Sequence, residues 1–260
     1  MNPLLHVHVP WREVDKWLGQ LLKRQLQPEF GFQGEDFDQL NPAELERVAA
    51  TLQKAELAVT VHAPFMDLNP GALEPIVREA TRQRLEQALE AAGRLGARLM
   101  VIHPGYDHWH YDQNQQLWLD QALPFFRELL PAIERAGLQI GIENIFETSP
   151  DSLTKLVSAI NHPLCGYCFD VGHWRLFAAD SCMKYWLEAL ADKLFHLHLH
   201  DNFGRTDQHL PLGEGHIDFT PLNEFLTRQP LLPTMTLEAH SAEHLERSLA
   251  ALPGLLPAAC

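Results

Sequence analysis

Histidines and carboxylates recur at the ends of short, β-rich apolar runs along this 260-residue chain. The runs at residues 58–63 and 98–103 end in VHAP and IHPG, which carry His62 and His103. Later runs end in IEN, FDVGH, HLHLHDN and LEAH, and a TDQH segment follows HLHLHDN. Imidazole and carboxylate groups together are typical ligands of Zn, Mn and Fe(II). The candidate metal ligands are His62, His103, Glu143, Asp170, His173, His198, Asp207, His209 and Glu238.

The recurrence of these groups favours metal binding over ordinary structural roles. A lone strand histidine is more often hydrogen bonded in the core, and Glu143 or Asp170 could cap the helix that follows it. Those alternatives do not explain why six successive strands end in a ligand type. Concentrated carboxylates also repel one another unless a cation compensates them. We therefore expect two or three divalent ions per chain, Zn or Mn, with Fe as a further option.

The elements that must position these residues alternate regularly along the chain. Their spacing, mostly about 30 to 40 residues, matches a strand–helix–strand unit. This alternation predicts an α/β fold, a (β/α)8 TIM barrel that forms a single domain over residues 1–260, with a doubly wound open sheet as the alternative. The expected strands are residues 4–9, 29–32, 58–63, 98–103, 139–144, 166–171, 194–199 and 234–239. The expected helices include residues 74–95 (ending at Gly96), 116–135, 151–160 and 241–251.

A barrel of this kind gathers the C-terminal ends of its strands at one mouth, where active sites lie. We therefore expect the nine candidate ligands to converge there. The loop GYDHWHYDQ after the fourth strand could stack a substrate with its rings, or its rings could pack on one another. Arg205 could contact a phosphate oxygen or pair with a surface acid. The predicted substrate-binding residues are His8, Tyr106, Trp109, Trp174 and Arg205.

Composition limits the partners and the compartment. The net charge of -14 argues against a nucleic-acid partner and favours a small-molecule substrate. No apolar run is long enough to span a membrane, and the N-terminal residues lack a secretory signal. Cys165 and Cys168 form a lone C-x-x-C within a strand-like run, which predicts buried unpaired thiols rather than a zinc ribbon or a thioredoxin motif. The four cysteines, which include Cys182 and Cys260, fit a cytoplasmic location, and the oligomeric state is not indicated.

Over about residues 58–240 the chain resembles the endonuclease IV / xylose isomerase-like TIM-barrel superfamily. The motifs are HAP, HPG, IEN, FDVGH, HLHLHDN, DQHLPLGEG and LEAH, and all nine ligand types of the endonuclease IV pattern stand in order. The resemblance implies three ions. They would be held by His62, His103 and Glu143; by Glu143, Asp170, His198 and Glu238; and by His173, Asp207 and His209.

The resemblance leaves three functional hypotheses. The first is a metal-dependent, phosphodiesterase-like hydrolase of a small phosphoester, with catalytic residues Glu143, Glu238, His173 and Arg205. The sugar isomerase and epimerase branch, which includes tagatose 3-epimerase-like enzymes, resembles the chain at fewer positions. It implies the second hypothesis, a one-ion isomerase or epimerase in which Glu143 and Glu238 act as base and acid. The third is a ligand-binding barrel with a decayed site. The acidic charge and short loops depart from a DNA repair enzyme.

Overall fold

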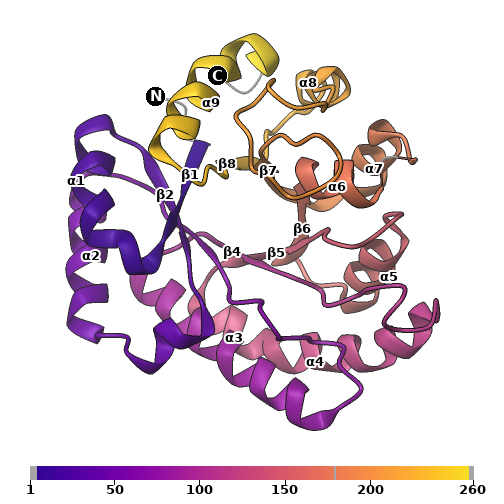
Figure 1. Ribbon diagram of the computed structural model, residues 1–260. Helices are drawn as coiled ribbons and strands as arrows, with labels where there is room; N and C mark the ends of the chain where they lie inside the picture. Colours follow the sequence, from indigo (N-terminus) through magenta and orange to yellow (C-terminus); the bar gives the residue numbers. More distant parts are fainter. Residues whose placement is uncertain (1–4, 179, 258–260) are drawn as a thin grey trace.

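Eight parallel strands follow one another around a closed barrel in the computed structural model, which describes residues 5–178 and 180–257 (Figure 1). Each strand pairs with the next along the chain, and β1 closes the ring by pairing with β8. The predicted (β/α)8 barrel is therefore confirmed, and the open sheet is excluded. The strands are β1 Leu5–Pro10, β2 Gln27–Gly31, β3 Thr60–His62, β4 Leu99–Ile102, β5 Gln139–Glu143, β6 Cys165–Asp170, β7 Leu194–Leu199 and β8 Thr234–Leu237.

Helices surround the barrel as an outer ring (Figure 1). The α-helices are α1 Val14–Arg24, α2 Pro42–Lys54, α3 Pro75–Leu95, α4 Gln115–Ala136, α5 Asp151–Ile160, α6 Val171–Phe177, α7 Met183–Leu190, α8 Thr220–Thr227 and α9 Ala242–Leu255. Short 3-10 helices are η1 Trp11–Glu13, η2 Gly34–Asp38 and η3 Ala191–Lys193. Within the described part of the chain, no helix is both long and apolar enough to cross a membrane.

Local sequence sets the bounds of α3. The Glu74 side chain accepts a hydrogen bond from the N–H of Ile76, and Pro75 at the first helical position has a φ already suited to a helix. Gly96 ends the helix in the left-handed conformation, with φ 68°. α5 begins at Asp151, as predicted, with Pro150 at the N-cap position and no side-chain cap.

The layer between strands and helices is the apolar core. Trp118, Phe126 and Trp186 are fully buried there. Cys165 packs in this layer, whereas Cys168 faces a separate small cluster with Leu99 and Val101, as opposite faces of a strand require. Both thiols are buried and free, which confirms the prediction for this pair. Cys182 is exposed, and Cys260 lies outside the described residues.

The barrel interior beneath the mouth is largely polar. Glu29 and His196 are fully buried, and Thr60, Thr236 and His6 are at most 1% exposed. We call these five residues the interior polar layer. Barrel interiors of this fold are usually filled by branched apolar side chains. Here polar groups lie directly below the ends of the strands and contact the residues above them.

Candidate active site

Glu143, the last residue of β5, lies at the centre of the barrel mouth. Its Oε2 is 3.2 Å from His62 Nε2 and 3.3 Å from His103 Nε2. Its Oε1 is 3.2 Å from both His173 Nδ1 and His198 Nδ1. Four imidazoles from β3, the end of β4, α6 and β7 thus meet on one buried carboxylate. This is the convergence that the strand ends predicted.

Two further carboxylates approach His198 from neighbouring strands. Its Nδ1 is 3.4 Å from Glu238 Oε1 and 3.8 Å from Asp170 Oδ2. Asp170 also caps α6, because its Oδ1 accepts a hydrogen bond from the N–H of His173 at 2.6 Å. The capping role considered for Asp170 is therefore real, and it coexists with a place at the mouth.

Asp207 and His209 complete the set from the loop after β7. Asp207 Oδ2 is 2.9 Å from His209 Nε2 and 3.5 Å from His173 Nε2. His209 Nδ1 lies 3.8 Å from Glu238 Oε2, which links this pair to the central group. His209 has φ 46°, a left-handed conformation that is uncommon for residues other than glycine and typical of functional sites.

Asp201 anchors the loop that carries Asp207 and His209. Its buried carboxylate accepts backbone hydrogen bonds from Asn202 at 2.8 Å, Gly213 at 3.0 Å and Ile217 at 3.1 Å. Its backbone also forms a bridge with Leu210. A side chain at position 215 would overlap the Asp201 carboxylate, so glycine is required there. These contacts fix the base of the loop independently of the central ligands.

His200 also belongs to the site, although it was not among the predicted ligands. Its Nε2 is 3.1 Å from both oxygens of Asp170, and its Nδ1 is 3.6 Å from Asp207 Oδ1. Its ring stacks on His209 at 4.0 Å. The motif HLHLHDN contains this residue, and strand alternation gives it the same orientation as His198. The sequence alone could therefore have identified His200 as a candidate site residue.

Charge compensation dominates the electrostatics of the site. Burial favours neutral imidazole, yet the Asp170, Asp207 and Glu143 carboxylates raise the pKa of His173 well above its usual value. The pKa of His209 rises to about 9 in the same way, because Asp207 and Glu238 outweigh its burial. Burial alone would raise the pKa of Glu143, but the surrounding imidazoles lower it well below its usual value. Without a metal, protons on His173 and His209 would therefore balance part of the carboxylate charge.

The arrangement fits divalent ions. His198 Nδ1 is buried and has no hydrogen-bond partner among the residues described, although three carboxylates lie around it. A buried polar atom needs a partner, and a cation held also by these carboxylates would supply one. One ligand atom from each residue lies within 4.8 Å of the others in several groups. These groups include His62–Glu143–His198, Asp170–His198–Glu238, Asp170–His173–His200 and His200–His209–Glu238.

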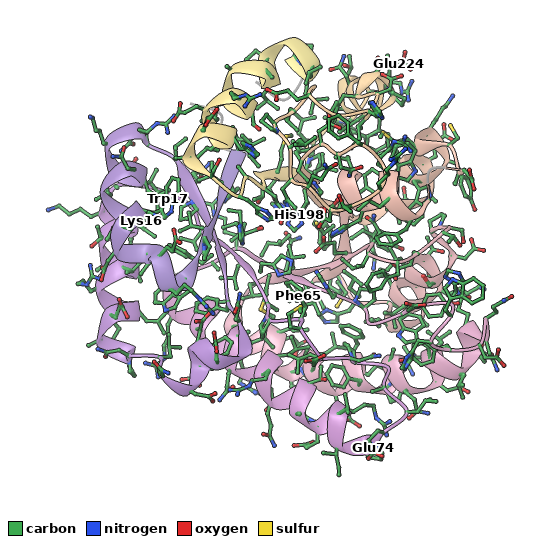
Figure 2. The ribbon with its side chains drawn as sticks, in the orientation of Figure 1. Lys16, Trp17, Phe65, Glu74, His198 and Glu224 are labelled. Carbon is green, nitrogen blue, oxygen red and sulfur yellow. The ribbon has the colours of Figure 1, made fainter. Side chains whose placement is uncertain are left out.

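A cleft of about 970 Å³ opens above these residues. Its floor contains His62, His103, Glu143 and Glu238, together with ligand candidates from the β7 loop. Figure 2 shows His198 near the middle of the ring of strands, with Phe65 beside the mouth. Phe65 is 41% exposed and stacks on His103 at 4.3 Å. Phe146 and Phe177 also line the cleft and are partly exposed, so its rim is aromatic.

The predicted substrate-binding residues divide into two groups. His8 and Tyr106 line the cleft. Trp109, Trp174 and Arg205 are not among its lining residues. Trp109 is 75% exposed, and Arg205 is exposed on the loop after β7. Trp174 packs instead against the apolar core.

The loop after β4 packs partly on itself and partly lines the cleft. Tyr106 stacks on Tyr111 at 5.9 Å and lies against Trp118 at 5.2 Å. The buried Tyr111 hydroxyl accepts a hydrogen bond from Asn69. Tyr111 is thus buried within the loop, as the self-packing alternative predicts, whereas Tyr106 and His110 line the cleft.

The cations that line the cleft are already paired with acids. Arg12 lies 2.8 Å from Glu35 and 3.4 Å from Asp36, and Lys16 lies 2.9 Å from Glu13. Figure 2 places Lys16 on α1 at the side of the barrel. The lining therefore offers little uncompensated positive charge to a polyanion such as a DNA backbone.

Curated relatives match part of the chain. An uncharacterized protein of Methanocaldococcus jannaschii is 31% identical over 193 residues, 72% of this chain and 66% of that protein. A probable endonuclease 4 of Mycobacterium ulcerans is 29% identical over 181 residues, 65% of this chain and 69% of that protein. The matched segment thus spans just under two thirds of the first relative's length.

Solved structures match nearly the whole chain. A D-tagatose 3-epimerase-like protein is 26% identical with a TM-score of 0.83, covering 97% of both chains. A protein from Thermus thermophilus whose structure followed soaking with ZnCl2 is 30% identical with a TM-score of 0.77, covering 99% of this chain and 98% of that one. The family model of xylose isomerase-like TIM barrels matches residues 26–255. The chain therefore belongs to the xylose isomerase-like TIM-barrel family.

Proposed function

We propose that this protein is a metal-dependent hydrolase with a multinuclear site, and that it acts on a small phosphoester. The observation that carries the proposal is the position of His103, His173, Asp207 and His209 around Glu143 and Glu238. A one-ion site built on Glu143, Asp170, His198 and Glu238 has no need of those four residues. Their assembly at one mouth supports a larger site.

The ligand assignment follows the contacts. His62 and His103 lie against Glu143 Oε2, whereas His198 lies against Glu143 Oε1, so Glu143 would contribute to two ion positions. Asp170 and Glu238 would complete the second position, and His173, Asp207 and His209 the third. Bound divalent ions supply a water of lowered pKa and polarise a phosphoryl oxygen.

The chain's own residues orient the substrate. The aromatic rim of Phe65, Phe146 and Phe177 offers an apolar surface for the part of the substrate that leads away from the polar floor. Because Arg12 and Lys16 are paired with acids, the floor must recognise the anion chiefly through the ligand site. A small phosphoester with an apolar or aryl group fits an aromatic rim above a polar floor better than a polyanion does.

Metal dependence of phosphodiester hydrolysis tests the proposal. Metal-stripped protein is reconstituted with Zn or Mn and assayed on bis(p-nitrophenyl) phosphate and on a panel of small phosphodiesters. We expect turnover that appears with metal and falls at least about 100-fold in His103→Asn and His209→Asn, because even partners of ligands contribute roughly 10–100-fold. No metal-dependent turnover across the panel would contradict hydrolysis.

A one-ion sugar epimerase is the second candidate. It is supported by the likeness to the D-tagatose 3-epimerase-like protein and by the position of Glu238 Oε1 and Glu143 Oε1 at 3.4 Å and 3.2 Å from His198 Nδ1. Two carboxylates at one ion could exchange a substrate proton as base and acid. An epimerase of this kind should incorporate solvent deuterium into a ketose carbon. The variants His103→Asn and His209→Asn should keep this activity. A binding-only barrel would show neither activity.

A further inference from the structure

Glu29 lies inside the barrel beneath the candidate ligands and is not one of them. It is the third residue of β2 and is fully buried. Its Oε1 is 3.1 Å from His198 Nε2, on the side of that ring opposite the three carboxylates at Nδ1. The same imidazole therefore contacts Glu29 with one nitrogen and the ligand site with the other.

The rest of the interior polar layer holds the Glu29 carboxylate in place. Its Oε2 accepts hydrogen bonds from the Thr60 hydroxyl at 3.1 Å and the Thr236 hydroxyl at 3.0 Å. His196 Nε2 lies 3.1 Å from the same oxygen. These contacts come from β3, β7 and β8, so the carboxylate is fixed from three sides. Its Oε1 is left for His198.

The contact between Glu29 and His198 is close without being fully aligned. The two atoms are at hydrogen-bonding distance, yet the angles do not meet those of a hydrogen bond, and Glu29 Oε1 is unpaired among the described atoms. A small rotation of the imidazole aligns the N–H with Oε1, and both atoms are otherwise buried without partners. An ionised carboxylate accepts only, so the proton must reside on His198 Nε2.

We propose that Glu29 is a positioning residue, which holds the proton of His198 on Nε2 and thereby presents the Nδ1 lone pair to the ion bound by Glu143, Asp170 and Glu238. Metal-ligating histidines commonly donate their other N–H to a carboxylate, which fixes the tautomer and raises the basicity of the ligand. The inference rests on the metal site of the proposed function and is independent of which reaction that site performs.

Nitrogen NMR of the zinc-loaded wild-type protein tests the tautomer directly. The His198 signals are assigned by their loss in His198→Gln. We expect Nε2 to be protonated and Nδ1 to be the zinc-bound nitrogen. A zinc-bound Nε2 or a proton on Nδ1 would overturn the proposal, and this measurement needs no variant of Glu29.

The variant Glu29→Gln tests the energetic consequence. Gln has nearly the same shape but no charge, so it accepts from Nε2 more weakly. We expect Co²⁺ affinity at this position to fall by roughly 10–100-fold, with a changed visible spectrum. The matched control is Glu147→Gln, a change of the same type at a buried carboxylate that contacts the backbone of Ile145. Equal affinity and an unchanged spectrum in Glu29→Gln and wild type would refute the role of Glu29.

These readouts separate two kinds of failure. If the protein binds Co²⁺ with the predicted tautomer but hydrolyses no phosphodiester, the reaction assignment is wrong and the role of Glu29 stands. If hydrolysis is metal dependent and Glu29→Gln binds Co²⁺ as wild type does, the reaction stands and the positioning role is wrong.

Discussion

The Glu143 carboxylate contacts four imidazoles at 3.2–3.3 Å, so its removal should disturb more than one ion position. We expect Glu143→Gln to lose metal and to lower activity by at least about 100-fold, because a neutral amide cannot bridge two cations. Metal content after dialysis, measured by mass spectrometry, checks this. Glu224→Gln, at an exposed position of α8, is the matched control (Figure 2). Full metal content in Glu143→Gln would rule out bridging.

Glu147 provides a pH test outside the ligand site. It is 2% exposed, and burial raises its pKa from 4.5 to about 8. The folded protein therefore binds the Glu147 proton more tightly than the unfolded chain does. The contribution of this proton to the free energy of unfolding is complete below pH 4.5 and is lost as the pH rises through 8. The difference amounts to at most roughly 5 kcal/mol.

The variant Glu147→Gln should remove this dependence while keeping an acceptor for the N–H of Ile145. We expect its free energy of unfolding, relative to wild type, to increase steadily between about pH 5 and pH 8. Urea denaturation at several pH values measures it. A constant difference across that range would show that Glu147 is ionised in the folded protein.

For individual site residues, the sequence indicates the residue types but not the partners that each side chain contacts. His198 could be nominated because it ends a strand, and His200 follows it with the same orientation. Choosing between them requires the register of β7 against β6, which places His198 opposite Asp170. Glu29 could not be nominated, because it lies within β2, and nothing in the run EFGF indicates that its side chain points into the barrel and reaches β7.

The junction of β6 with α6 depends on Gly172. A methyl group there would overlap the imidazole of His200, which itself contacts Asp170. We expect Gly172→Ala to destabilise the fold by about 1–3 kcal/mol and to reduce metal content, since the ring must move. Urea denaturation and metal analysis measure both effects.

Gly19→Ala is the matched control for this junction. Gly19 lies in α1, and an added methyl group meets no heavy atom within 4 Å. The change should stabilise the protein by up to about 1 kcal/mol, because alanine favours a helix. If Gly172→Ala were as stable and held as much metal as Gly19→Ala, the close packing of His200 on α6 would contribute to neither stability nor metal binding.

The order of elements was predictable, and their lengths less so. Strand-like apolar runs located every strand, and six of them end in a polar residue, because both faces of a barrel strand are buried except at the mouth. β3 spans three residues where six were expected, since only Thr60–His62 pair in register with both neighbouring strands. The predicted helix at 74–95 is nearly identical to α3, because Pro75 and Gly96 mark its ends.

Across the whole molecule, metal binding should be coupled to proton release. The pKa values of His173 and His198 lie well above the usual value, and that of His209 is about 9. At pH 7 the metal-free site therefore carries protons that ions must displace. Affinity for Zn²⁺ should rise with pH up to about 9, by roughly tenfold per pH unit for each proton released. Calorimetry in two buffers of different ionisation enthalpy counts these protons. Buffer-independent heats would contradict the coupling.

Because of its net charge of -14, the protein should bind nucleic acids only weakly. We expect a duplex with an abasic site to bind more weakly than about 10⁻⁴ M at physiological salt, since the lining cations are already paired. Fluorescence anisotropy measures this binding. Micromolar affinity that falls steeply with salt would instead indicate a basic surface used for DNA.

The anchoring of the Asp207–His209 loop on Asp201 has an evolutionary consequence. Because Asp201 fixes the base of this loop separately from Glu143, His198 and Glu238, insertions or deletions between residues 203 and 209 would leave those three residues in place. A lineage could thus gain or lose the outermost ligands in one genetic event. Diversification among these barrels would then proceed by exchanging a single loop while the barrel itself is inherited intact.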